Sequence, residues 1–168
     1  DRINTLQSDF VQTAVNKMFG RKATSRGRLS IKRPSLMRWN YYEPEKQLFI
    51  VDSRKFWWFT PLNRQVVIKP LKKVFGSNLP LAFIMGNKKI ADEFKVSFLR
   101  AMINLSKLEI KVRRGTFRIF ELDMYDAYHN KTSVALSNYR ENIELPEEMF
   151  HFTAPEGVRV ITPEDIPF

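Results

Sequence analysis

The chain has 168 residues, of which 43% are hydrophobic, and its aromatic residues comprise 14 Phe, 5 Tyr and 3 Trp. It contains no cysteine, which excludes disulfides, thiolate metal sites and a cysteine nucleophile. The longest apolar run, Leu79–Met85, is much shorter than the roughly 18 residues of a transmembrane helix. The formal net charge of +10 permits attraction to nucleic acid or to anionic lipid, but the basic residues are spread along the chain rather than gathered in one arm.

The beginning of the chain combines a helical and an extended pattern. Ile3, Leu6, Phe10 and Val11 recur at roughly helical spacing, which predicts the end of a helix that turns extended from about Phe10. The basic and polar stretch 20–27 that follows is typical of a hairpin loop.

Five short segments come next, and turn residues separate them. They are residues 28–32, 36–42, 47–53, 55–60 and 64–70. Their alternation and spacing of about ten residues predict a meander of antiparallel strands. Leu29, Ile31, Met37 and Trp39 share one parity, as on the covered face of a strand, and Arg33 shares it with them. An arginine pointing with an apolar set needs hydrogen-bond partners.

The middle of the chain predicts a short helix at residues 79–86. Ser77 or Asn78 is suited to its N-cap, Pro80 to its first turn and Gly86 to its C-terminal end. This helix is apolar on nearly every side, so it needs cover from several directions or leaves a face for a ligand.

Strand patterns then resume, followed by a proline-rich tail that we expect to be irregular. The strand segments are residues 94–99, 107–115, 116–125, 131–142 and 150–161, and the tail is 162–168. The outline is α+β and mainly antiparallel β, with about ten short strands and helices on one face. We expect one domain over residues 1–168, and a strongly curved sheet of this size could enclose a cavity.

The sequence gives no support for an enzyme or a metal site. His129 lies at an expected turn and His151 on an expected solvent face, and neither has a neighbour at metal-ligand spacing. Asp126 near His129 could form one edge of a catalytic triad, but no serine in a tight glycine-flanked turn accompanies it. Aromatic residues interleaved with basic ones at 36–42 and 54–60 could stack bases, although they serve equally as one apolar sheet face.

Several of these segments, in this order, resemble the LolA family of periplasmic lipoprotein carriers. The resemblance lies in GRLSIKRPSLMRWNYYEP at 27–44, QLFIVDSRKFWWFTPLNRQVV at 47–67, FVQ at Phe10–Gln12, LPLAFIMG at 79–86, DAYHNKTSVALSN at 126–138 and FHFTAPEGVRVI at 150–161. It implies an unclosed half β-barrel of about eleven antiparallel strands with a short helical lid.

The resemblance also implies a function without catalysis or a cofactor. A carrier of this family receives the acyl chains of a lipoprotein in an apolar cavity. It takes this cargo from an inner-membrane transporter of the ATP-binding-cassette type, crosses the periplasm, and delivers the cargo to an outer-membrane receptor. We expect a monomer. The alternatives are a carrier of other lipids or a receptor-like relative on the same scaffold; below these rank a basic nucleic-acid-binding domain and an unrecognised hydrolase.

The resemblance assigns roles to particular residues. Arg33 is expected to latch the lid by donating hydrogen bonds to its backbone carbonyls; the alternative is that Arg33 reaches solvent at a strand end. The predicted acyl-chain cavity residues are Leu29, Ile31, Met37, Trp39, Phe49, Val51, Trp57, Phe59, Leu122, Val134 and Leu136. The predicted lid residues are Leu79, Leu81, Ala82, Phe83, Ile84 and Met85.

Overall fold

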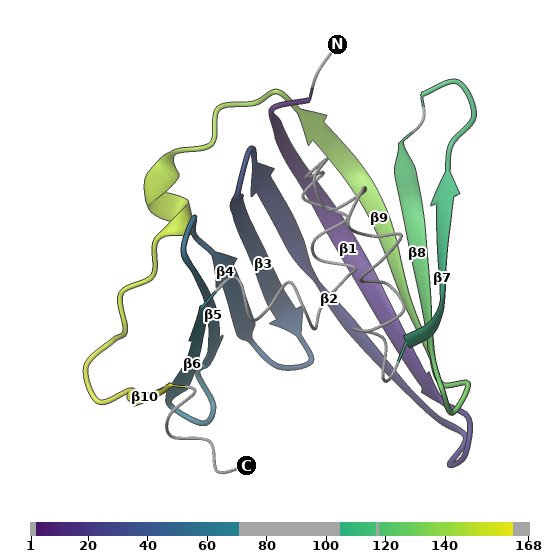
Figure 1. The fold of residues 1–168 in the computed structure, drawn as a ribbon, viewed down its shortest axis with the longest axis horizontal. Helices are drawn as coiled ribbons and strands as arrows, with labels where there is room; N and C mark the ends of the chain where they lie inside the picture. The colour runs from purple at the N-terminus through teal and green to yellow at the C-terminus, as the bar shows by residue number, and fades with distance from the viewer. Residues whose placement is uncertain (1–2, 71–104, 117, 163–168) are drawn as a thin grey trace.

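A single curved sheet forms the described part of the molecule. The computed structural model describes residues 3–70, 105–116 and 118–162. Its strands are β1 (Thr5–Asn16), β2 (Arg21–Lys32), β3 (Leu36–Glu43), β4 (Gln47–Val51), β5 (Lys55–Thr60), β6 (Gln65–Pro70), β7 (Leu105–Val112), β8 (Ile119–Asp126), β9 (Lys131–Glu141) and β10 (Arg159–Ile161). In space their order is β10-β6-β5-β4-β3-β2-β1-β9-β8-β7 (Figure 1).

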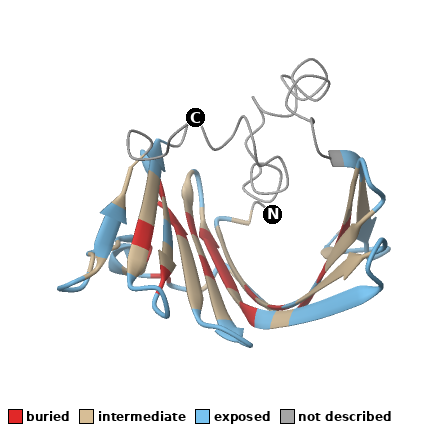
Figure 2. Cartoon of the chain, turned by 90° about the horizontal axis from the view of Figure 1, so that it is seen from below, coloured by how far each residue is buried: buried red, intermediate tan, exposed pale blue. Residues whose placement is uncertain are grey.

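All neighbouring strands are antiparallel except β10, which runs parallel to β6. The sheet bends into an open trough with a concave and a convex face, and its two edge strands, β7 and β10, are not paired with each other (Figure 2). This confirms the expectation of a mainly antiparallel, unclosed barrel. The described residues contain ten strands, and their only helix is a 3-10 turn, η1 (Glu147–Phe150). The helix predicted at 79–86 and the strand predicted at 94–99 lie outside the described residues.

The predictions for the first 27 residues were wrong in two places. The segment expected to begin as a helix is strand β1, which pairs with β2 on one side and with β9 on the other. The stretch 20–27 is mostly strand β2 rather than a loop, and the turn lies between Asn16 and Arg21. In both cases long-range pairing decides the structure, because each residue from 21 to 32 has a partner on β1.

The last described segment also differs from its prediction. Only the end of 150–161 is a strand; the rest runs as η1 and extended chain along the convex face of β2–β5. Lys32 Nζ donates to the Leu145 carbonyl at 3.1 Å, and an Arg38 guanidinium nitrogen donates to the Met149 carbonyl at 2.8 Å. The alternation of Phe150 and Phe152 therefore serves packing on a sheet face instead of a strand ladder.

On the other half of the convex face, ion pairs connect β8 with its neighbours β7 and β9. The Asp123 carboxylate, only 1% exposed, lies 3.0 Å from both Lys111 Nζ and Lys131 Nζ. Burial raises the pKa of Asp123, but the Ser133 side chain and the two ammonium groups outweigh burial and hold that pKa at about 2. No helix among the described residues has the length and apolar character needed to cross a membrane.

Candidate functional site

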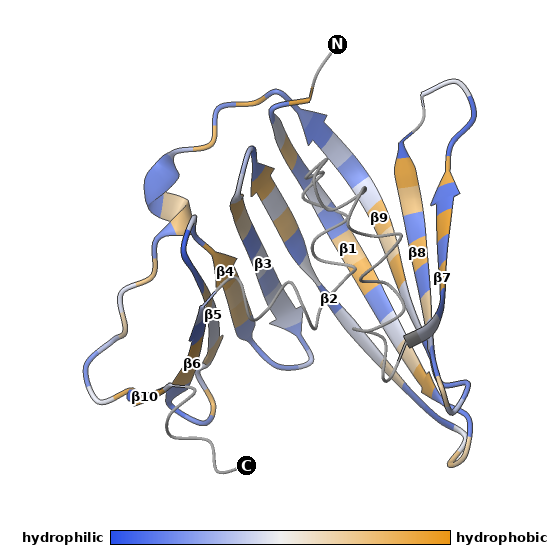
Figure 3. Ribbon diagram, viewed as in Figure 1, coloured by the Kyte–Doolittle hydropathy of each residue, from blue (hydrophilic) through white to orange (hydrophobic). Residues whose placement is uncertain are grey.

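The concave face of the sheet gathers apolar side chains from most of its strands. Figure 3 shows hydrophobic and hydrophilic bands that alternate along several strands, as expected where successive side chains point to opposite faces of the sheet. The buried cluster consists of Phe10, Leu29, Ile31, Met37, Trp39, Val51, Phe56, Leu122, Val134 and Leu136. Phe49 is partly buried against it. The predicted cavity residues Leu29, Ile31, Met37, Trp39, Phe49, Val51, Leu122, Val134 and Leu136 are thus brought together.

Two predicted cavity residues lie on the wrong face. Trp57 and Phe59 point to the convex side, where both rings pack against Phe152 at centroid distances of 5.7 and 5.1 Å. Their neighbours Phe56 and Trp58 occupy the concave side instead, opposite Val51 and Phe49 in the ladder with β4. The pairing register between β4 and β5 would have identified Phe56 and Trp58 as concave residues. Alternation within β5 alone does not show which of its two sets of side chains points to the concave face.

Aromatic rings form a continuous strip across the concave face. Phe10 contacts Trp39 and Tyr41 at centroid distances of 5.0 and 4.8 Å. The strip continues from Tyr41 to Phe49 at 5.5 Å and from Phe49 to Trp58, which stack at 5.6 Å. Five side chains from four strands therefore offer one extended apolar surface.

Three polar side-chain atoms interrupt this strip, one of which is the Trp58 indole N–H that donates to Gln47 Oε1 at 3.2 Å. The Tyr41 hydroxyl donates to Gln12 Oε1 at 2.8 Å, and burial raises the pKa of Tyr41 to about 12. The Trp39 indole N–H is buried and has no hydrogen-bond partner among the described residues. A buried donor without a partner costs free energy, so an acceptor atom that reached this N–H would form a favourable hydrogen bond.

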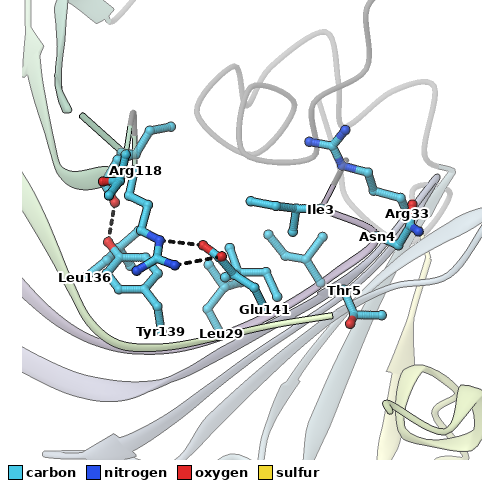
Figure 4. A pocket seen from close by; sticks show the side chains of 13 residues that line it. Ile3, Asn4, Thr5, Leu29, Arg33, Arg118, Leu136, Tyr139 and Glu141 are labelled. Carbon is cyan, nitrogen blue, oxygen red and sulfur yellow. Dashed lines mark hydrogen bonds and ion pairs between the residues drawn. The ribbon is translucent and has the colours of Figure 1, made fainter. Parts of the chain in front are cut away.

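A pocket of about 220 Å³ opens on the concave side near the start of β1 (Figure 4). The apolar side chains that line it are Ile3, Leu6, Leu29, Ile31, Ile119 and Leu136. Arg118 lies at its rim, where Nε and one terminal nitrogen donate to the two Glu141 oxygens at 2.7 and 2.8 Å. The Arg118 guanidinium also lies 5.9 Å from the centroid of the Tyr139 ring. The pocket is thus an apolar space whose polar edge includes the neutralised Arg118–Glu141 pair.

Arg33 lies at the end of β2 on the rim of the same pocket. Its backbone N–H donates to the Asn4 carbonyl at 2.9 Å, whereas its exposed guanidinium has no hydrogen-bond or ion-pair partner in the described ranges. The predicted lid residues Leu79, Leu81, Ala82, Phe83, Ile84 and Met85 lie outside those ranges. The latch therefore stays a prediction.

The Asp126 side chain, considered above as one edge of a catalytic triad, has a structural role. The Asp126 carboxylate accepts hydrogen bonds from the backbone N–H groups of Tyr128 and Asn130 at 2.8 and 2.9 Å, and so shapes the β8–β9 turn. His129 and His151 are exposed, and no three metal-ligating side chains of the described part converge. The apolar concave face, with its pocket, is suited to bind hydrocarbon.

Comparison with known proteins agrees with this geometry. Residues 1–153 match the family model described as "Outer membrane lipoprotein carrier protein LolA". An outer-membrane lipoprotein carrier protein of Chromobacterium violaceum is 31% identical over 94% of this chain and 81% of its own length. The protein of the same name from Nitrosospira multiformis is 28% identical over 96% of this chain and 84% of its own length.

Two solved structures share the fold. An uncharacterized conserved protein from Thermus thermophilus superposes with a TM-score of 0.53, covering 95% of this chain and 90% of that one at 13% identity. A DUF1329 family protein from Desulfovibrio piger gives a TM-score of 0.55, covering 90% of this chain and 91% of that one, also at 13% identity. At this identity the likeness concerns the sheet architecture alone.

Proposed function

The chain belongs to the LolA family of outer-membrane lipoprotein carrier proteins, a family of transport proteins rather than enzymes, and we propose that its concave face binds the acyl chains of lipoproteins. The observation that carries the proposal is the continuous apolar surface of that face, from the aromatic strip on β1–β5 to the pocket beside Arg118.

Physical chemistry explains why such cargo needs a carrier. Each buried CH₂ of an acyl chain is worth about 0.8 kcal/mol, so an exposed chain aggregates or enters any membrane. An apolar trough shields the chain while it crosses water. A carrier must also release its cargo, so a lid that competes for the same surface would lower the net binding energy to the difference between lid and cargo.

The polar groups of the concave face fit the polar part of a lipid anchor. Acyl chains of a lipoprotein are joined through ester and amide carbonyls, which are hydrogen-bond acceptors. The unpartnered Trp39 indole N–H is a donor for such a carbonyl within the apolar strip. The Arg118–Glu141 pair at the pocket edge would face the peptide end of the cargo and water.

Arg33 is proposed to latch the lid at the rim of this pocket. A guanidinium has five N–H donors and keeps its charge, so it can bond several carbonyls at once. Its position on the pocket rim and its lack of a side-chain partner among the described residues support this role.

The cellular route is proposed from the family. The chain would take its cargo from an inner-membrane transporter of the ATP-binding-cassette type, act in the periplasm, and pass the cargo to an outer-membrane receptor. A carrier of other lipids on the same scaffold is the competing function, since an apolar trough by itself does not distinguish between kinds of acyl chain.

Mass spectrometry of the protein purified from its native host tests both functions. We expect lipid-modified N-terminal peptides of lipoproteins to co-purify and to be released by organic solvent. Recovery of phospholipid or free fatty acid alone would favour the competing function. Protein that carries neither, and does not take up a fluorescent alkyl probe, would refute both.

A further inference from the structure

Two neighbouring turns at one end of the sheet carry large apolar side chains that the rest of the described chain leaves open. The turn between β1 and β2 holds Met18 and Phe19, which are 76% and 67% exposed, and the turn between β8 and β9 holds Tyr128, which is 73% exposed. The two turns are joined, because the Lys17 backbone N–H donates to Asn130 Oδ1 at 3.0 Å (Figure 1). Exposed apolar groups of this size at one place indicate an interaction site.

Both turns are held by their own hydrogen bonds. The Phe19 backbone N–H donates to Asn16 Oδ1 at 3.1 Å. On the other turn, the Asp126 carboxylate accepts from the backbone N–H groups of Tyr128 and Asn130. The apolar side chains are therefore presented on ordered turns, and little conformational entropy remains to be lost when they bind.

Positive charge surrounds the apolar side chains. Lys17, Arg21 and Lys22 are exposed and form no ion pair within the described residues. The carboxylate of Asp126, on the neighbouring turn, is occupied by the turn N–H groups. From Arg21 to Ser25, β2 pairs with β1 alone, so the tip of this hairpin projects past β3.

We propose that Lys17, Met18, Phe19, Arg21, Lys22 and Tyr128 form a docking tip for the surface of an anionic lipid bilayer. Apolar side chains at the tip of a narrow hairpin can enter the boundary between headgroups and acyl chains, while the cations contact lipid phosphates. A protein partner fits this feature less well, because a stable interface covers about 800 Å² on each side and a projecting hairpin tip is far smaller. The docking tip needs no cargo, so it goes beyond the proposed carrier function.

Vesicle flotation of the full chain without lipoprotein tests the docking tip. We expect at least ten-fold more binding to phosphatidylcholine vesicles with 30% phosphatidylglycerol than to pure phosphatidylcholine, and a fall at high salt. Met18→Ser with Phe19→Ser should lower binding at least about ten-fold. Lys17→Gln, Arg21→Gln and Lys22→Gln should each remove roughly five-fold and together abolish the preference for anionic lipid.

Leu62→Ser is the matched control, since Leu62 is also 73% exposed but lies on the β5–β6 turn. Because the chain has no cysteine, Phe19→Cys and Leu62→Cys allow a polarity-sensitive dye to be attached at one site each. The dye at position 19 should shift to the blue on vesicles and the dye at position 62 should not. Equal binding to both vesicle types, or equal losses and shifts at the two positions, would overturn the proposal.

Discussion

The Phe10 ring lies over Gly27, its cross-strand partner in the β1–β2 ladder. A methyl group placed at Gly27 would come within 2.7 Å of a Phe10 ring carbon and would collide with the Asn40 carbonyl oxygen. The absence of a side chain at Gly27 thus lets β3 and the Phe10 ring approach β2 closely, and Phe10 anchors the aromatic strip from this position.

Gly27→Ala should therefore destabilise the protein. Neither the β3 backbone nor the well-packed ring can move away without loss, and overpacking of this kind costs about 1–3 kcal/mol. Urea unfolding measures the change in the free energy of unfolding. Ser25→Ala, two residues away on the same face of β2, adds no atoms and should lie within about 0.5 kcal/mol of the wild type. Equal stability of the two variants would show that β2 and β3 can move apart at Gly27 to accommodate a methyl group without loss of stability.

The adjacent tryptophans Trp57 and Trp58 should separate stability from ligand binding, because they point to opposite faces. Trp57 packs on Phe152 and donates its indole N–H to Asp52 Oδ2 at 2.9 Å, so Trp57→Ala should lower the free energy of unfolding by about 2–3 kcal/mol. It should leave the affinity for a fluorescent acyl probe unchanged.

Trp58→Ala should have the reverse effect. Trp58 is exposed and stacks on Phe49 at the end of the aromatic strip, so its loss should weaken probe binding several-fold and cost at most about 1 kcal/mol of stability. Probe titration and urea unfolding of both variants check this. If Trp57→Ala were the variant that lost probe, the assignment of the concave face as the binding surface would be wrong.

The Asp123 ion pairs should make stability depend on acid pH. The folded pKa of about 2 lies below the unfolded value of 3.8, so the folded state favours the charged form. The stabilisation is present above about pH 4 and is lost as the pH falls from the unfolded pKa through the folded pKa. Since the lysine partners are partly exposed, we expect about 1–2 kcal/mol.

Asp123→Asn should remove this acid dependence. At pH 7 the variant should be less stable than the wild type, because Lys111 and Lys131 lose their shared partner, and the difference should shrink between pH 4 and pH 2. Chemical unfolding at pH 7, 4 and 2.5 provides the comparison. Parallel pH profiles for the two proteins would contradict the assignment of the low pKa to the neighbours of this carboxylate.

Arg33→Leu should impair cargo release if Arg33 is the latch. Without the hydrogen bonds that favour a closed lid, the lid competes less strongly with cargo for the concave surface. The variant should therefore hold acyl cargo more firmly and transfer it to an acceptor more slowly. A transfer assay with labelled lipoprotein measures both. Arg54→Leu, an exposed arginine on the β4–β5 turn, is the charge-matched control. Unchanged transfer by Arg33→Leu would refute the proposal that Arg33 holds the lid closed.

The sequence was sufficient to predict the strands whose alternation and turn residues agree. Leu29, Ile31, Met37 and Trp39 share one parity and lie on one face, as expected. The failures arose where the outcome depends on distant partners. Strand β1 was mistaken for the end of a helix because Ile3 and Val11 add apolar residues out of phase with Leu6 and Phe10, and pairing on both sides with β2 and β9 overrides that local pattern.

The face of β5 could not be predicted from its own residues. The consecutive aromatic positions from Phe56 to Phe59 are compatible with either orientation of β5. The turn at 52–54 also interrupts the alternation, so the faces of β4 do not predict those of β5. Only the pairing of Val51 with Phe56 fixes which side Trp57 takes. The convex cover formed by Phe152 was missed for a related reason, since alternating phenylalanines are typical of a strand as well as of a segment lying on a sheet.

The edge strands β7 and β10 are not joined to each other, and this affects the width of the trough. In a closed barrel, strand number and shear fix the diameter. No ladder joins the two margins among the strands that the structure describes, so a small change of twist, shared among many strands, can widen or narrow the trough without breaking a backbone hydrogen bond. With the proposed function, the same trough would accommodate acyl chains that differ in number or length.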